Sequence, residues 1–169
     1  TGKEFQINTT NLAGEFEKAR GTIKIYSLKA PSRTFRTRLW QQADRTLYSR
    51  EQYYQFFPYD QYEDETNKYL WSRDKEVFTL TYDTEKKKTF TLENLTSWSS
   101  GEYVLEITGT DTSGQEVKDL SYFTVFSPSS KLIPTPAVHY FEGIHLSAEP
   151  GEKATFAAGT ADKKINVLY

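Results

Sequence analysis

The segment 92–126 constrains the fold most, because its side chains alternate between the two faces of an extended chain. The residues that mark the apolar face of its first half are Tyr103, Leu105 and Ile107. The sequence Asp111–Gly114 follows and is typical of a turn, because glycine is free to take a positive φ. A second extended run occupies residues 117–126. The pattern predicts an antiparallel strand pair at the end of a sandwich domain, and it contains no catalytic constellation.

Shorter extended runs before this segment predict further strands. Their ranges are 5–9, 22–28, 35–40, 68–71, 76–82 and 89–92. The helix candidate lies between Asp44 and Pro58, where Ser49 is a suitable N-cap and Pro58 ends the helix. About seven strands at short spacing, with one helical insertion, predict an all-β fold built as an antiparallel sandwich.

A segment rich in proline and serine, residues 128–136, marks the clearest domain boundary. Three extended runs follow it, at 138–148, 153–157 and 165–169. Since three strands are about half of a sandwich, we expect residues 1–127 to form one domain and 137–169 to begin a second, incomplete one. The chain contains no Met, so we expect a processed product or an excised piece of a longer protein.

Composition excludes several classes of function. The net charge is −2, which leaves no basic excess for nucleic acid or an anionic membrane. No apolar run approaches the roughly 20 residues of a membrane span. Cysteine is absent, which excludes disulfides, thiolate metal sites, cysteine nucleophiles and thioesters. His139 and His145 would lie about 20 Å apart along a strand, too far to share a metal. We therefore predict no catalytic residue, no metal site and no cofactor.

The acidic loop at 60–65 offers oxygen ligands of the kind that calcium prefers. Its carboxylates are Asp60, Glu63, Asp64 and Glu65. Their spacing matches no calcium loop and the loop has no glycine, so a solvated acidic loop is the favoured interpretation.

Aromatic residues are dense between positions 40 and 71. An exposed strip of such rings could stack on sugars or bind a partner. The alternative, which we favour, is that the rings pin the short helix to the sheet. The residues most suited to an exposed, partner-binding strip are Tyr54, Tyr59 and Tyr62.

Several segments, taken in order, carry a resemblance to a known family. They are Gly21–Pro31, Arg36–Trp40, Tyr53–Pro58 and Ser100–Ile107, with Asp111 and Gly114 after them. In this order they resemble a macroglobulin domain of the kind found in bacterial alpha-2-macroglobulin-like proteins. The segments Glu149–Phe156 and Ile165–Tyr169 look like the opening of the next macroglobulin domain, so the resemblance covers nearly the whole chain.

The resemblance implies a seven-stranded, immunoglobulin-like sandwich and a function that belongs to a larger array. Members of the family are large, extracytoplasmic proteins in which strings of such domains form a ring-like scaffold. An attacking protease cuts a bait region, and many members then trap the protease through a Cys-Gln thioester. This chain has no Cys and no segment that stands out as a bait region.

We therefore expect a non-catalytic scaffold segment of a broad-spectrum endopeptidase inhibitor, located in the periplasm or at the cell surface. The expected partners are neighbouring domains of the same chain and, through the full-length protein, target proteases. Two other functions stay open. One is a cell-surface carbohydrate-binding or adhesin module that uses the aromatics at 53–71, and the other is an accessory sandwich domain of a secreted enzyme.

Overall fold

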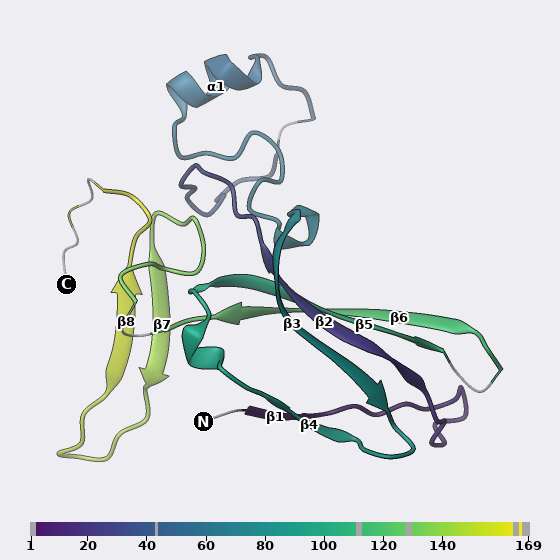
Figure 1. Cartoon of the computed structure of the whole chain (residues 1–169). Helices are drawn as coiled ribbons and strands as arrows, with labels where there is room; N and C mark the ends of the chain where they lie inside the picture. The colour runs from purple at the N-terminus through teal and green to yellow at the C-terminus, as the bar shows by residue number, and fades with distance from the viewer. Residues whose placement is uncertain (1–2, 43, 111–112, 128–129, 164–165, 167–169) are drawn as a thin grey trace. The chain divides into compact units, whose positions relative to one another are not determined.

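The computed structural model confirms a mostly β, antiparallel architecture with one short α-helix in the residues that it describes (Figure 1). Those residues are 3–42, 44–110, 113–127, 130–163 and 166. The chain divides into two compact units. The first unit combines Thr1–Lys29 with Ser72–Ser127, and the second combines Ala30–Trp71 with Pro128–Tyr169. Within the described ranges, no helix has the length or the hydrophobicity of a membrane-spanning segment.

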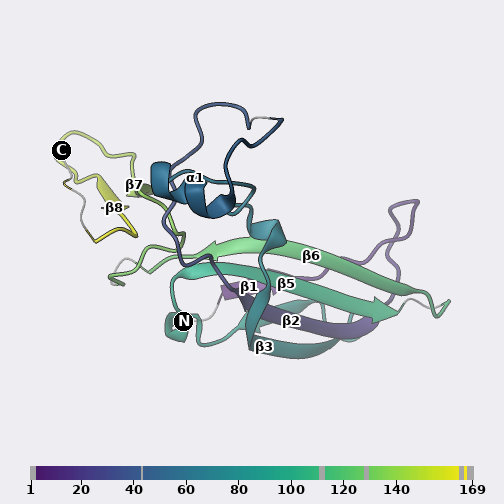
Figure 2. The ribbon, with the colours of Figure 1, turned by 90° about the horizontal axis from the view of Figure 1, so that it is seen from above.

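The first unit is built from a four-stranded and a two-stranded antiparallel sheet. The larger sheet has the order β3-β2-β5-β6, which Figure 2 shows from above. Its strands are β2 (Arg20–Leu28), β3 (Arg73–Asp83), β5 (Gly101–Thr110) and β6 (Glu116–Val125). The smaller sheet pairs β1 (Lys3–Gln6) with β4 (Thr89–Leu92). The predicted closing strand pair is therefore β5 and β6, paired over their full lengths.

One face of the four-stranded sheet forms the core of the first unit. Ile23 of β2 is fully buried and lies opposite Ile107 of β5, as the two-residue alternation of both segments requires. Phe90 of β4 packs in the same cluster, and its ring stacks on that of Phe5 at 5.8 Å. The two-stranded sheet therefore covers part of this face, and each fully buried aliphatic side chain contributes about 1.5–3 kcal/mol.

The opposite face of the same sheet carries paired charges beside the buried Val104 of β5. Glu106 on β5 accepts hydrogen bonds from Nζ of Lys118 at 2.5 Å and from Nη2 of Arg73 at 2.6 Å. These two bonds, that from Lys118 first, hold the pKa of the Glu106 carboxyl below its ordinary value. Alternation along β5 thus separates an apolar core face from a face of paired charges.

The second unit contains the helix, a short 3-10 helix and a strand pair. Their bounds are α1 (Arg50–Phe56), η1 (Lys68–Leu70), β7 (Tyr140–His145) and β8 (Thr155–Gly159). Helix α1 confirms the predicted start at Ser49, whose Oγ accepts from the Gln52 N–H at 3.3 Å, while the Ser49 N–H donates to Gln52 Oε1 at 3.1 Å.

Two predicted strands are wrong. The segment 68–71 forms η1, because the Asn67 side chain accepts from the Tyr69 N–H at 3.2 Å and caps a helical turn. The segment 35–40 makes only an isolated bridge between Phe35 and Ala137, in which Phe35 N–H donates to Pro136 O at 2.8 Å. Its arginine side chains bind the neighbouring loop carbonyls and carboxylates rather than a strand partner.

The contacts of Phe35 also bear on the domain organisation, because they join the inserted segment 30–71 to residues after 130. The predicted division into domains 1–127 and 137–169, with a linker at 128–136, stays a prediction. Three predicted features lie partly outside the described residues. They are the turn, at Asp111, the linker, at Pro128, and the strand 165–169, of which only Asn166 is described.

Candidate functional site

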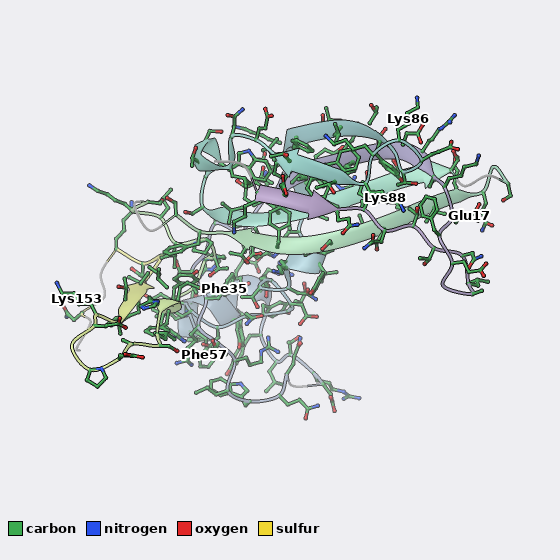
Figure 3. All side chains as sticks on the ribbon, turned by 90° about the horizontal axis from the view of Figure 1, so that it is seen from below. Glu17, Phe35, Phe57, Lys86, Lys88 and Lys153 are labelled. Atoms are coloured by element: carbon green, nitrogen blue, oxygen red, sulfur yellow. The ribbon has the colours of Figure 1, made fainter. Side chains whose placement is uncertain are left out.

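The aromatic residues around α1 form a continuous chain of ring contacts. Ring centroids lie 5.2 Å apart for Tyr48 and Phe56, 5.1 Å for Tyr53 and Phe57, and 5.5 Å for Tyr53 and Tyr62. Figure 3 labels Phe57 and Phe35 in this part of the chain. The rings therefore hold the short helix against other segments of the second unit, as expected of a helix too short to stand alone in water.

The three tyrosines predicted to bind a partner are all engaged within the second unit. The half-buried Tyr54 donates its hydroxyl to Glu65 Oε1 at 2.6 Å, and the guanidinium of Arg33 lies 4.1 Å from its ring centroid. Burial first, and then this hydrogen bond, raises the pKa of Tyr54 to about 12. Tyr62 is half-buried too, and its hydroxyl lies 3.3 Å from the Tyr48 carbonyl.

Tyr59 is exposed, although a hydrogen bond between its hydroxyl and the Asp162 carboxylate raises its pKa. A binding role for these tyrosines stays a prediction. The aromatic side chains that the structure exposes most between positions 40 and 71 are instead Tyr69, Phe56 and Trp40. Only the fold shows that the ring of Phe56, on the short helix α1, is exposed.

The acidic loop differs from the expected solvated loop, because arginines bind its carboxylates. Asp60 is buried and accepts a bidentate pair of hydrogen bonds from Arg36, of which Nη2 to Oδ2 is 3.0 Å long. Glu63 pairs with Arg50. In the described part of the chain, no group of three or more acidic or histidine side chains is arranged to hold a metal ion. His139 and His145 are both exposed.

The first unit carries a groove of about 880 Å³, which falls within the range of ligand-binding pockets. It lies between the loop that follows β1, residues 7–19, and the paired ends of two strands. These are the C-terminal end of β5 and the N-terminal end of β6. Apolar side chains line its floor, namely Ile7, Ala19, Tyr82, Ile107 and Val117. Glu17, which Figure 3 labels, and Asp119 contribute carboxylates to its lining. Sequence reasoning missed this groove, because its lining comes from segments that only the sheet register brings together.

Tyr82 is the one floor residue of this groove with a polar side-chain atom. It is only 6% exposed. Gly109 leaves space for this hydroxyl, since a Cβ at position 109 would overlap it. Burial raises the pKa of Tyr82, so the phenol is protonated at neutral pH and can donate a hydrogen bond.

The β7–β8 strand pair has one covered and one bare face. The Ile133 side chain fills the space beside Gly159 on the covered face. On the other face the rings of Phe141 and Phe156 stack at 5.4 Å, and they are 59% and 58% exposed. This bare face is a second apolar surface of the second unit, separate from the aromatics around α1.

No known protein family, curated protein or solved structure matches this chain. The interpretation of function therefore depends on the surfaces described above and on the resemblance seen in the sequence.

Proposed function

We propose that this chain is a non-catalytic scaffold segment of a bacterial alpha-2-macroglobulin-like protein. Residues 1–127 would supply one macroglobulin-like sandwich with a helical insertion, and the following strands would begin the next. In the full-length protein this array inhibits endopeptidases broadly, outside the cytoplasm in the cell envelope. The segment positions neighbouring domains and performs no reaction of its own.

The observation that carries this proposal is the bare face of the β7–β8 pair. An isolated two-stranded hairpin is at best marginally stable in water. Here Phe141 and Phe156 stack on each other but keep more than half of their surfaces exposed. A hairpin with one packed face and one apolar face is what the opening of a sandwich presents to the strands that complete it.

The segments that make up the second unit give further support. The segment 30–71 is inserted between β2 and β3 of the first unit, yet it clusters with the residues after 127. The Val138 N–H donates to Phe35 O at 2.8 Å, so the insertion and the strands of the second unit share backbone hydrogen bonds. Such a connection, in which a segment inserted in one module packs with the next module along the chain, is expected of a scaffold of successive modules.

Hydrogen exchange tests the proposal. The chain would be compared with a version extended by the next roughly 100 residues of its reading frame, a typical domain length. We expect the amides of Phe141 and Phe156 to exchange quickly in the shorter chain and to gain protection in the longer one. Unchanged exchange in the longer chain would contradict the proposal.

Inhibition assays give a second, independent test. A panel of endopeptidases incubated with the chain at equimolar ratio should keep its full activity, because a scaffold segment contains neither bait nor trap. Inhibition by the chain alone would show that this segment acts on proteases directly.

A second candidate function is a carbohydrate-binding or adhesin module, which the exposed rings around α1 favour. Tyr48 and Phe56 form an exposed edge-to-face pair, and such rings can stack on sugars. A glycan array separates this candidate from the scaffold. Specific binding that is lost in Phe56→Ala, but kept in a Phe141→Ala control, would favour the module over the scaffold.

A further inference from the structure

The outer edge of β6 is a long and regular open sheet edge of the first unit (Figure 2). Among the described strands β6 pairs with β5 alone, and this pairing runs from Glu116 to Val125 without a register shift. The other edge strand of the sheet, β3, is interrupted, because its register with β2 shifts beside Tyr26. Proteins protect sheet edges with such irregularities or with lysines. The one lysine of β6, Lys118, is instead bound to Glu106 at 2.5 Å, so this edge stays open to a further strand.

The backbone of β6 offers hydrogen-bonding groups on its outer side. Residues 116–121 are all exposed, and Val117 and Leu120 keep 57% and 40% of their surfaces exposed. The Leu120 N–H donates to Oδ1 of Asp119, the residue before it, at 2.9 Å. Because the N–H groups of a strand point alternately to its two sides, this one points away from β5. Every second residue of β6 therefore turns its backbone groups outward, and the central donor is held only by a local side chain.

A second copy of β6 is a suitable partner for this edge, because one antiparallel register of the strand against itself pairs its side chains well. Among the registers that overlap most of the strand, those centred on Lys118 or Asp119 place like charges opposite each other, which is destabilising. The register centred on Ser121 places the Asp119 carboxylate against the Phe123 ring. The register centred on Leu120 avoids all of these contacts.

The register centred on Leu120 also forms favourable pairs. It brings residues 116–124 of the two copies opposite each other. Val117 then faces Phe123 of the second copy, and a β-branched side chain opposite an aromatic one stabilises strand pairing. The two Leu120 side chains meet at the axis. The two most exposed apolar side chains of the strand, Val117 and Leu120, are thereby covered.

We propose that two copies of this chain associate through their β6 edges, antiparallel and about a two-fold axis at Leu120. The two four-stranded sheets then form one continuous sheet. The Leu120 N–H of each copy donates to the Leu120 carbonyl of the other, in place of the Asp119 carboxylate. Such an isologous contact uses the same edge of both copies, so the assembly closes at the dimer. This interface goes beyond the scaffold function, which assigns no second copy.

Sedimentation velocity on the full chain, from about 1 µM to about 1 mM, tests the proposal. An edge-to-edge contact buries less surface than a standard protein interface and associates weakly. We therefore expect a monomer at the lowest concentration and a dimer at the highest. A monomer at every concentration, or growth beyond the dimer, would overturn the proposal and leave the scaffold function untouched.

A pair of lysine variants locates the interface. Leu120→Lys places two ammonium groups opposite each other at the axis, so the dimer should dissociate at least about tenfold more readily, and more so at low salt. The matched control Leu12→Lys changes an exposed leucine outside β6 and should leave the dissociation constant unchanged. Unchanged dimerisation in Leu120→Lys, or an equal loss in Leu12→Lys, would contradict the assigned edge.

Single cysteines report the register, because the chain has no cysteine of its own. Residues opposite each other in a hydrogen-bonded antiparallel pair have Cα atoms about 5.5 Å apart, within the range of a disulfide. Lys118 faces Tyr122 of the second copy, so its own counterpart lies about 13 Å away. Leu120→Cys should therefore form a disulfide-linked dimer at least about tenfold faster than Lys118→Cys. Equal rates, or faster cross-linking of Lys118→Cys, would contradict the register.

Discussion

Replacing Glu106 by Gln tests whether the paired charges on the outer face of the four-stranded sheet stabilise the fold. Glu106 is 8% exposed and accepts from both Lys118 and Arg73. A hydrogen bond to a charged group is worth about 1.5–3 kcal/mol. Because both cations are substantially exposed, solvent screens part of this interaction. We therefore expect the free energy of unfolding at pH 7 to fall by about 1–2 kcal/mol in Glu106→Gln.

The pH dependence of this difference has a definite sign. The folded-state pKa of Glu106 lies below its ordinary value, so the carboxylate stabilises the fold at pH values above the unfolded-state pKa. That contribution is lost as the pH falls through the folded-state pKa. Urea unfolding followed by circular dichroism should therefore show a large difference between the two proteins at pH 7 and a shrinking difference below about pH 4.

The matched control for this experiment is Glu76→Gln. Glu76 pairs with Lys24 at 3.4 Å on the same face, but both side chains of this pair are well exposed. Its substitution should cost less than about 0.5 kcal/mol, as is typical of surface ion pairs. The reasoning about Glu106 fails if the two substitutions cost the same, or if the Glu106→Gln difference grows as the pH falls.

Three further predictions follow from single contacts. Ser49→Ala removes the side-chain cap of α1 and should destabilise the helix by about 1 kcal/mol, measured as faster amide exchange in residues 50–56. Gly109→Ala places a Cβ against the Tyr82 hydroxyl and should lower the free energy of unfolding by about 1–3 kcal/mol in urea titrations. Glu65→Gln removes the carboxylate that accepts from Tyr54, so the highest tyrosine pKa in a spectrophotometric titration should fall below about 12.

The parts of the fold that the sequence predicted correctly depend on local patterns. The alternation in β5 was sufficient to place Leu105 and Ile107 on one apolar face, because the side-chain period of a strand is independent of its partner. The capping box of α1 is likewise contained within four residues, Ser49 to Gln52. The strand predicted at 68–71 was wrong because a single side chain, that of Asn67, caps a helical turn there instead.

The candidate sites depended on long-range contacts, which the sequence pattern does not contain. Whether Tyr54 is exposed is decided by Arg33 and Glu65, which approach it from two different loops. Asp60 is buried for a similar reason, because Arg36 reaches it from a segment 24 positions away. Arginine side chains that approach a predicted loop in the fold can therefore bury its polar and aromatic residues.

The groove shows most clearly how register creates a feature that no single segment predicts. Gly21 of β2 lies opposite both Tyr82 of β3 and Gly109 of β5, so two glycines meet beside one tyrosine at one end of the sheet. The Tyr82 hydroxyl occupies the space that Gly109 leaves open, since a Cβ at position 109 would overlap it. No single segment marks this end of the sheet in the sequence, because the register alone brings the two glycines and the tyrosine together.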